Sequence, residues 1–123
     1  MNNEQSKIIR EQAQRSALRE HSVPLYLTSS FIFDSADQGR AVFAEEEEGM
    51  VYSRYANPNT TEFINKVCLL ENAEAGLAFA SGMGAVFATF AGFIESGDHI
   101  VSSRAIFGST HQLFTQLFPR WGV

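Results

Sequence analysis

Two short segments of this sequence combine residue types that can bind an anionic group. In the first, Ser81-Gly82-Met83-Gly84 stands between an apolar run of strand length and an apolar run of helix length. Backbone N–H groups at the beginning of a helix carry the positive end of the helix dipole, so they can hold a phosphate, which glycine lets approach closely. Alternatively, the glycines serve only close packing of helix on strand, and the residues by themselves leave both interpretations open.

The second segment, Tyr52-Ser53-Arg54-Tyr55, places a phenol and a guanidinium two residues apart. In an extended chain such side chains project to the same side, and both groups can donate hydrogen bonds to a phosphate. The alternative is that Arg54 is an ordinary surface charge. Phe107, which follows a second predicted strand, can stack on a flat aromatic ring or serve as a core residue.

Other kinds of site have weaker support. Gly82 and Gly84 match the first two glycines of a dinucleotide-binding motif, but Phe87 occupies the third position and the acid expected about twenty residues later is missing. The histidines lack metal-ligand spacing, and Cys68 falls on the apolar face of a predicted helix, where it is interpreted as a packing residue. The run Glu45–Glu48 is interpreted as a solvated helix end, because neighbouring helix positions do not converge on one point. We therefore predict no metal site.

Strand and helix signals alternate in the second half of the chain. Apolar runs of strand length at 77–80 and 99–103 alternate with helical patterns at 83–94 and 109–121. Gly97 is expected to cap the first of these helices, and Ser109, three residues before Gln112, is expected to cap the second. This order predicts an α/β fold with a parallel sheet and flanking helices. In such sheets ligands bind beyond the carboxyl ends of the strands, where Ser81 and Phe107 both stand.

The first half is expected to alternate helices with irregular chain. Pro24 restricts the segment around it to an extended or edge conformation. Asn59 stands three residues before Glu62, which predicts that it caps a helix, and Gly49 is expected to stop the helix before it. The predicted segments are a polar helix or arm at 4–20, extended chain at 23–33, a helix at 35–48, a loop at 51–59 and an amphipathic helix at 59–71.

Composition excludes several classes of protein. The 123 residues contain 9 Lys and Arg against 14 Asp and Glu, a formal charge of −5, which argues against nucleic-acid binding. A single cysteine excludes an internal disulfide and fits a reducing, cytoplasmic compartment. The polar N-terminus lacks a secretory signal pattern. Residues 75–94 carry no charge, but half are Ala or Gly and both flanks are acidic, so we expect a buried strand-turn-helix and no membrane contact.

Three motifs, in order, carry a family resemblance: Tyr52–Thr60, Ala80–Ala85, and Gly97–Ile100 leading to Phe107–Thr110. Together they resemble the Cys/Met metabolism family of pyridoxal-phosphate (PLP) enzymes, which includes cystathionine γ-synthase, cystathionine lyases, methionine γ-lyase and homoserine-ester sulfhydrylases. The resemblance runs from about Ala13 to the last residue. It implies the beginning of a fold-type-I PLP-dependent transferase, with 1–58 as an extended N-terminal arm and dimer-contacting segment and 59–123 as the first part of the large PLP-binding domain.

The resemblance also implies roles for particular residues. Tyr52 and Arg54 match the positions that reach across a dimer interface and hold the cofactor phosphate of the neighbouring subunit. Ser81, Gly82 and Met83 match the segment that binds the phosphate of its own subunit's cofactor, with the backbone amides of the last two as donors.

Phe107 matches the position whose ring stacks on the pyridine of the cofactor. Most relatives have tyrosine there, so a role that needs the hydroxyl is lost in this chain. The sequence Phe107-Gly108-Ser109-Thr110 resembles the O-succinylhomoserine sulfhydrylases more than the lyases.

The activity implied by the resemblance is PLP-dependent γ-replacement on an activated homoserine, as in an O-succinylhomoserine sulfhydrylase or cystathionine γ-synthase of methionine biosynthesis. The alternative is γ-elimination, as in a methionine γ-lyase or cystathionine lyase. The expected partners are an amino-acid substrate and further copies of the chain, assembled as a dimer of dimers.

The lysine with which this family forms its Schiff base has no match in the chain. The sequence contains only Lys7, in its polar first residues, and Lys66, which is expected on the solvent side of its helix. We therefore expect an N-terminal fragment of an enzyme that carries no catalytic residue and is inactive alone. A non-catalytic interaction module is the alternative from a different class of protein.

Overall fold

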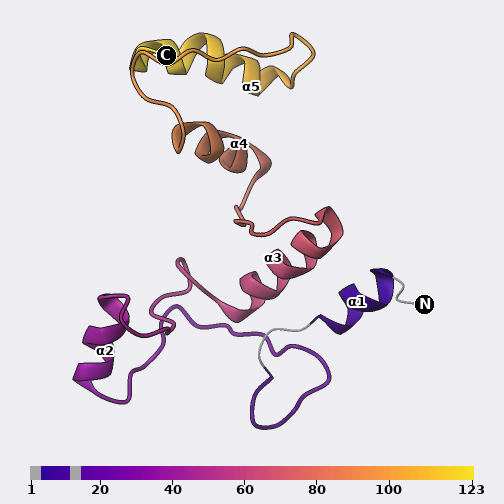
Figure 1. Cartoon of the computed structure of the whole chain (residues 1–123), viewed down its shortest axis with the longest axis vertical. Helices are drawn as coiled ribbons and strands as arrows, with labels where there is room; N and C mark the ends of the chain where they lie inside the picture. The colour runs from indigo at the N-terminus through magenta and orange to yellow at the C-terminus, as the bar shows by residue number, and fades with distance from the viewer. Residues whose placement is uncertain (1–3, 12–14) are drawn as a thin grey trace. The chain divides into compact units, whose positions relative to one another are not determined.

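The computed structural model describes residues 4–11 and 15–123 (Figure 1). The chain forms two compact units, Met1–Leu77 and Ala78–Val123. The helices of the first unit are α1 (Glu4–Arg10), α2 (Ala36–Phe43) and α3 (Pro58–Glu71). Those of the second are α4 (Gly82–Ala91), α5 (Gly108–Gln112), the π-helical η1 (Leu113–Leu117) and the 3₁₀-helical η2 (Phe118–Trp121).

α1 is shorter than the helix or arm predicted over 4–20. It ends at Arg10 and contacts α3, while positions 12–14 of the prediction lie outside the described residues and 15–20 form no helix. The amide and hydroxyl of Ser16 both donate hydrogen bonds to the Glu20 carboxylate. Both bonds lower the pKa of the Glu20 carboxyl below its ordinary value, and the bond from the Ser16 hydroxyl has the larger effect. They also give this stretch of backbone an alternative to helical hydrogen bonding.

α2 begins where the sequence predicts but ends before the predicted Glu48. The Ser35 hydroxyl caps its beginning by accepting from the Gln38 amide at 3.1 Å. The helix ends at Phe43 because Glu45 adopts a left-handed φ of 57°. The run Glu45–Glu48 is therefore an exposed turn after the helix, not its last turn.

Gly49, the predicted helix stop, has a different structural reason. α2 has already ended when the chain reaches it. A methyl group on Gly49 would stand 2.8 Å from Cγ2 of Val42, well inside the distance at which two carbons can pack. Glycine at this position therefore lets the returning chain pass close to α2.

α3 has Asn57 as its N-cap, not the predicted Asn59. The Oδ1 of Asn57 accepts a hydrogen bond from the Asn59 amide at 2.9 Å. Proline suits the first helical position that follows, Pro58, because an N–H there has no partner within the helix. Asn72, with a φ of 51°, ends the helix in the left-handed conformation.

Asn59 instead ties the extended segment 23–33 to α3. Its Oδ1 accepts from the Tyr26 amide at 2.8 Å, and its Nδ2 donates to the Pro24 carbonyl at 2.7 Å. Further along, the same segment forms an isolated antiparallel bridge between Ser30 and Tyr52. The segment is thus held from two sides without becoming part of a sheet.

The apolar face predicted for α3 is only partly covered. Phe63 and Leu70 are 60% and 62% exposed, whereas Glu62 is buried. Lys66, expected on the solvent side, donates a hydrogen bond to Oε1 of Glu62. The Oε2 of Glu62 is buried without a hydrogen-bond partner, so this acid is half satisfied.

Aromatic rings form the core of the second unit. Phe118 is fully buried, and its ring lies 5.5 Å from that of Trp121. Phe90 and Phe114 meet edge to face with centroids 4.7 Å apart, a favourable geometry for aromatic pairs. Phe87 of α4 contacts both Phe118 and Trp121. The predicted apolar face over 113–121 is confirmed, and it packs on α4.

Two helix ends in this unit differ from the predictions. α4 ends at Ala91 with Gly92 as its cap, and Gly97, the predicted cap, lies in a later turn with a φ of 99°. Ser109 lies inside α5, whose N-cap is Phe107 and has no side-chain hydrogen bond. The helix predicted over 109–121 is built from α5, η1 and η2, because a π-helical turn interrupts its regular hydrogen bonding.

The strands predicted at 77–80 and 99–103 are absent from the structure. A strand needs a neighbour for its backbone N–H and C=O groups, and among the described residues the only β pairing is the bridge at Ser30. Leu77 and Val101 are 84% and 90% exposed, so these segments also lack apolar cover. The parallel sheet therefore stays a prediction.

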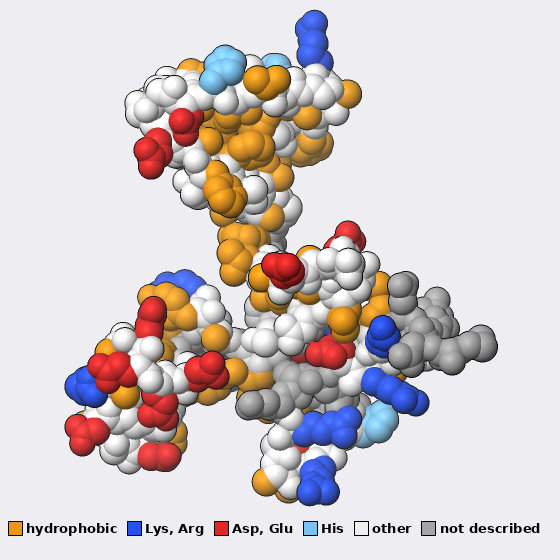
Figure 2. Space-filling model, in the orientation of Figure 1, with side chains coloured by type: hydrophobic (Ala, Val, Ile, Leu, Met, Phe, Trp, Pro, Cys, Tyr) orange, Lys and Arg blue, Asp and Glu red, His pale blue; other side chains and the backbone are white. Residues whose placement is uncertain are grey.

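Each unit leaves large apolar side chains exposed. Examples are Leu27 and Ile32 in the first unit, at 93% and 96%, and Phe93 in the second, at 84%. Figure 2 shows hydrophobic side chains on the surface of both units. α4 was expected to be buried on most faces, yet it contains no buried residue. Such apolar surface is typical of polypeptide that packs against further polypeptide.

The uncharged stretch 75–94 contains only α4 as regular structure. Within residues 4–11 and 15–123, no helix is long and apolar enough to cross a membrane.

Asn57→Ala should destabilise the protein, because it removes the cap of α3 and two further hydrogen bonds of the buried amide. We expect a loss of about 2 kcal/mol, visible as a lower midpoint of thermal unfolding. Asn57→Asp keeps the capping oxygen and loses the amide donor, so its midpoint should fall between those of the parent protein and Asn57→Ala. Asn65→Ala, in the same helix, removes a side chain with no hydrogen bond in the described structure and should leave the midpoint unchanged. Equal midpoints for Asn57→Ala and Asn65→Ala would contradict this account.

Candidate functional site

Tyr52, Arg54 and Tyr55 form one cluster in the first unit. The segment is a turn within the loop predicted over 51–59, because the amides of Tyr55 and Ala56 both donate to the Tyr52 carbonyl, at 2.9 and 3.1 Å. The turn still brings the predicted pair together. The guanidinium carbon of Arg54 lies 5.3 Å from the ring centroid of Tyr52 and 5.5 Å from that of Tyr55. Both distances are within the range of a cation–π contact.

Hydrogen bonds to two other segments of the unit hold this turn in place. The Ser53 amide donates to the Ser29 carbonyl at 2.9 Å, and its hydroxyl donates to the Thr28 carbonyl. The Nδ2 of Asn57 donates to Ser53 Oγ at 3.1 Å and to the Tyr26 carbonyl at 3.2 Å. Asn57 is buried, so its two hydrogen bonds are the part of this support that is best shielded from solvent.

The donors of Arg54 are available for a ligand. Ion pairs in the described structure join Arg40 to Glu46, at 2.8 Å, and Lys66 to Glu62. Among the residues that the structure describes, the Arg54 guanidinium makes neither an ion pair nor a hydrogen bond. A planar guanidinium held by its face presents its N–H groups in the plane, where a phosphate can accept two of them.

The first turn of α4 is the second candidate element. Ser81 caps the helix, its hydroxyl accepting from the Gly84 amide and its carbonyl from the Ala85 amide, each at 3.0 Å. The amides of Gly82 and Met83 have no partner in this part of the structure. A methyl group on Gly82 would meet no atom within 4 Å. Two unpaired amides at an open helix N-terminus fit a phosphate group.

Phe107 lies on the surface of the second unit. Its side chain is 69% exposed, and among the described residues its ring contacts no other ring. The aromatic core of the unit is built without it, so the structure of this chain does not place Phe107 in a core. Its ring face is free to stack on a flat ligand, which stays a prediction.

The predicted site residues thus fall into two groups. Tyr52 and Arg54 belong to the first unit and lie together, while Ser81, Gly82, Met83 and Phe107 belong to the second. Sequence reasoning missed Tyr55, Ser53 and Asn57 as supports of the arginine. Two signals were present: a tyrosine on each side of the arginine, and an Asn-Pro pair of the kind that begins a helix.

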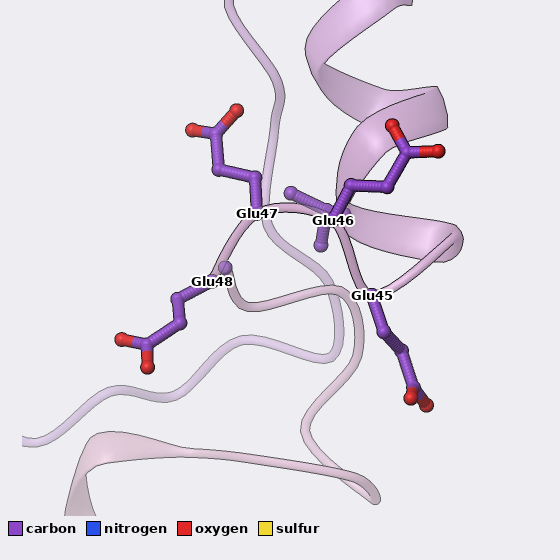
Figure 3. Close-up of a pocket in the computed structure, with 6 residues that line it drawn as sticks. Glu45, Glu46, Glu47 and Glu48 are labelled. Atoms are coloured by element: carbon purple, nitrogen blue, oxygen red, sulfur yellow. The ribbon is translucent and has the colours of Figure 1, made fainter.

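The acidic run next to α2 is not a metal-ligand cluster. Figure 3 shows the carboxylates of Glu45, Glu46, Glu47 and Glu48 pointing in different directions around the turn. Glu46 is bound by Arg40, whose pKa it raises. Within the described residues, no group of three or more His, Cys, Asp or Glu side chains could hold a metal ion.

Cys68 has the half-buried position expected of a packing residue. Its Sγ lies 3.1 Å from the place where a methyl group on Gly76 would stand, so the sulfur fills space beside the chain that leaves α3.

Comparison with known proteins places these residues in a family context. The family model described as Cys/Met metabolism PLP-dependent enzyme matches residues 5–123. Over 102 residues the chain is 46% identical to an L-methionine gamma-lyase of Fusobacterium nucleatum, covering 83% of this chain and 26% of that protein. Over 115 residues it is 43% identical to an O-succinylhomoserine sulfhydrylase of Pseudomonas aeruginosa, covering 94% and 28%. The chain spans about a quarter of the length of the curated relatives it matches.

Solved structures of related proteins agree with this family assignment. A putative O-acetylhomoserine (thiol)-lyase from Campylobacter jejuni superposes with a TM-score of 0.89 at 29% identity, covering 99% of this chain and 30% of that one. That structure contains N′-pyridoxyl-lysine-5′-monophosphate. The metB protein of Corynebacterium glutamicum superposes with a TM-score of 0.82 at 28% identity, covering 98% and 29%. Both likenesses support the fold-type-I assignment.

Gly82→Ala decides between the two explanations of the glycine. If Gly82 is kept for close approach of a ligand, alanine in the unliganded protein should raise the free energy of unfolding by up to about 1 kcal/mol, since it favours the helix and meets open space. Gly84→Ala should gain less, because its methyl group would stand 3.0 Å from the capping oxygen of Ser81. Thermal unfolding of both variants measures this order. A strong loss of stability in Gly82→Ala would show that the glycine serves packing.

Proposed function

The chain belongs to the family of Cys/Met metabolism PLP-dependent enzymes, and from this premise we propose that its longer protein replaces the γ-substituent of an activated homoserine with a sulfur nucleophile. The observation that carries the proposal is the agreement between the family's phosphate-binding motifs and two groups of unpaired donors. These are the Arg54 guanidinium and the amides at the beginning of α4. Replacement over elimination is favoured by Phe107-Gly108-Ser109-Thr110, which resembles the sulfhydrylases.

Each candidate residue has a distinct task in this proposal. The Gly82 and Met83 amides donate to the phosphate of their own subunit's cofactor, and Ser81 holds them in place by capping α4. The Tyr52 hydroxyl and the Arg54 guanidinium donate to the phosphate of the neighbouring subunit's cofactor.

PLP supplies an electron sink through which bonds at the α, β and γ carbons of an amino acid can be broken. The ring of Phe107 would hold the flat cofactor by stacking on it. Because Phe107 has no hydroxyl, it can neither give nor take a proton at that place. If the reaction needs a proton donor or acceptor at that place, a group other than residue 107 must provide it in this protein.

The lysine required by this chemistry is expected outside the 123 residues. Lys66 is bound to the buried Glu62 and is held away from a ligand-binding role. The chain by itself should therefore bind phosphate groups without catalysing a reaction. The alternative of a non-catalytic interaction module requires a mature protein of 13.6 kDa, whereas the enzyme proposal requires one several times larger; the mass of the natural product separates them.

The activity of the full-length protein is tested with two substrates. With O-succinylhomoserine and sulfide we expect homocysteine and succinate, and with methionine alone we expect no 2-oxobutyrate. The similarity to methionine gamma-lyases supports the second candidate, γ-elimination. Release of 2-oxobutyrate from methionine, without homocysteine formation in the first reaction, would identify the protein as a lyase.

Arg54→Ala in the full-length protein should weaken PLP binding about ten- to a hundredfold, because a paired guanidinium–phosphate contact is worth roughly 1.5–3 kcal/mol. Titration of the apoprotein with PLP, followed by absorbance, measures the affinity. Arg40→Ala is the matched control, since Arg40 is an exposed arginine of the same unit that pairs with Glu46. If Arg54→Ala binds PLP as tightly as Arg40→Ala, the role of Arg54 is wrong.

A further inference from the structure

Arg54 lies between two tyrosines, of which the proposed function uses only Tyr52. We propose that Tyr55 is a positioning residue whose ring holds the Arg54 guanidinium in the orientation that receives the cofactor phosphate. The inference rests on the proposed function of Arg54 and adds a second residue to it. It starts from the 5.5 Å between the Arg54 guanidinium carbon and the Tyr55 ring centroid, close to the 5.3 Å found for Tyr52.

The backbone geometry makes this contact a consequence of the turn. The Tyr55 amide donates to the Tyr52 carbonyl at 2.9 Å, so the two ring-bearing residues stand at the two ends of one closed turn with Arg54 between them. Ser53 is fastened to Thr28 and Ser29 on the neighbouring segment. Neither ring therefore needs another contact to stay beside the guanidinium.

The ring of Tyr55, not its hydroxyl, is the useful part. The side chain is 77% exposed, and within the described structure its hydroxyl makes no hydrogen bond. An aromatic face attracts a guanidinium without occupying its N–H groups, which an acidic neighbour would do. A free arginine side chain loses considerable rotamer entropy when it binds, so one already held in place binds a phosphate more tightly.

Arg40, in the same unit, shows what a carboxylate partner does to an arginine. Its two terminal nitrogens donate to the two oxygens of Glu46, at 3.1 and 2.8 Å, so these donors are occupied. Tyr55 orients the Arg54 guanidinium and leaves its N–H donors unpaired. Orientation by a ring is thus compatible with ligand binding, whereas orientation by an acid competes with it.

The test compares PLP affinity of full-length apoprotein variants by absorbance titration. Tyr55→Leu should raise the dissociation constant about two- to fivefold, the range of one exposed cation–π contact. Tyr55→Phe keeps the ring and should bind like the parent. In the Arg54→Ala background Tyr55→Leu should have no further effect, since the residue through which it acts is gone.

The outcomes separate this inference from the proposed function. If Arg54→Ala weakens PLP binding while Tyr55→Leu binds like the parent, the role of Tyr55 is wrong and that of Arg54 stands. If Tyr55→Leu has the same effect with and without Arg54, Tyr55 acts by another route and the inference is overturned. If Arg54→Ala itself leaves PLP affinity unchanged, both fall. Thermal midpoints of the apoproteins, expected to be equal, show that a loss of affinity is not a loss of folding.

Discussion

The buried side chain of Asn57 joins three parts of the first unit. Its oxygen caps α3, and its amide donates to the Tyr26 carbonyl of the extended segment and to the Ser53 hydroxyl of the turn. A glutamine would be too long to satisfy all three at once, and an aspartate has no donor. The turn that carries Arg54 is tied to this amide through Ser53, whose own amide and hydroxyl bind the carbonyls of Ser29 and Thr28.

A second constraint is the amount of surface that the chain leaves uncovered. Only Phe118 among the large apolar side chains described is fully buried, and α3 and α4 both present apolar residues to solvent. Helices with such faces gain stability by packing against other elements. In the proposed enzyme, those elements come from the rest of the polypeptide and from a neighbouring subunit, so the binding groups become positioned as the chain is covered.

Local structure was predictable from the sequence where it depends on residues that are close together in the chain. The helix predicted from Ser35 begins there, and the apolar spacing of Phe114, Phe118 and Trp121 forms the aromatic core. Errors arose where two signals competed: Asn57 and Asn59 both resemble caps, and the proline between them decides for the first. The two predicted strands are absent because a strand needs a partner strand, which can be distant in sequence. The period of apolar residues within a segment carries no information on whether such a partner exists.

The candidate site residues stay a prediction, but part of their local geometry could be anticipated from the sequence and the contacts that support them could not. Glycines before an apolar helix indicated Gly82 and Met83, and the structure gives these amides the unpaired state that anion binding needs. That Tyr52 and Arg54 lie together was expected from an extended chain and is achieved by a turn. The hydrogen bonds from Ser53 to Thr28 and from Asn57 to Tyr26 join residues more than twenty positions apart, so the local signals at the turn could not reveal these two partners.

In the proposed enzyme, one cofactor site is completed by residues of two subunits. Mixing full-length Arg54→Ala subunits with subunits that lack the cofactor-binding lysine tests it directly. In a mixed dimer, the Arg54→Ala subunit keeps its own lysine and receives an intact arginine from its neighbour. The account predicts that activity of the mixture, at a PLP concentration too low for Arg54→Ala alone, rises clearly above that of either variant. Activity no higher than the sum of the two separate variants would contradict it, because an arginine that serves its own subunit cannot be supplied by the other.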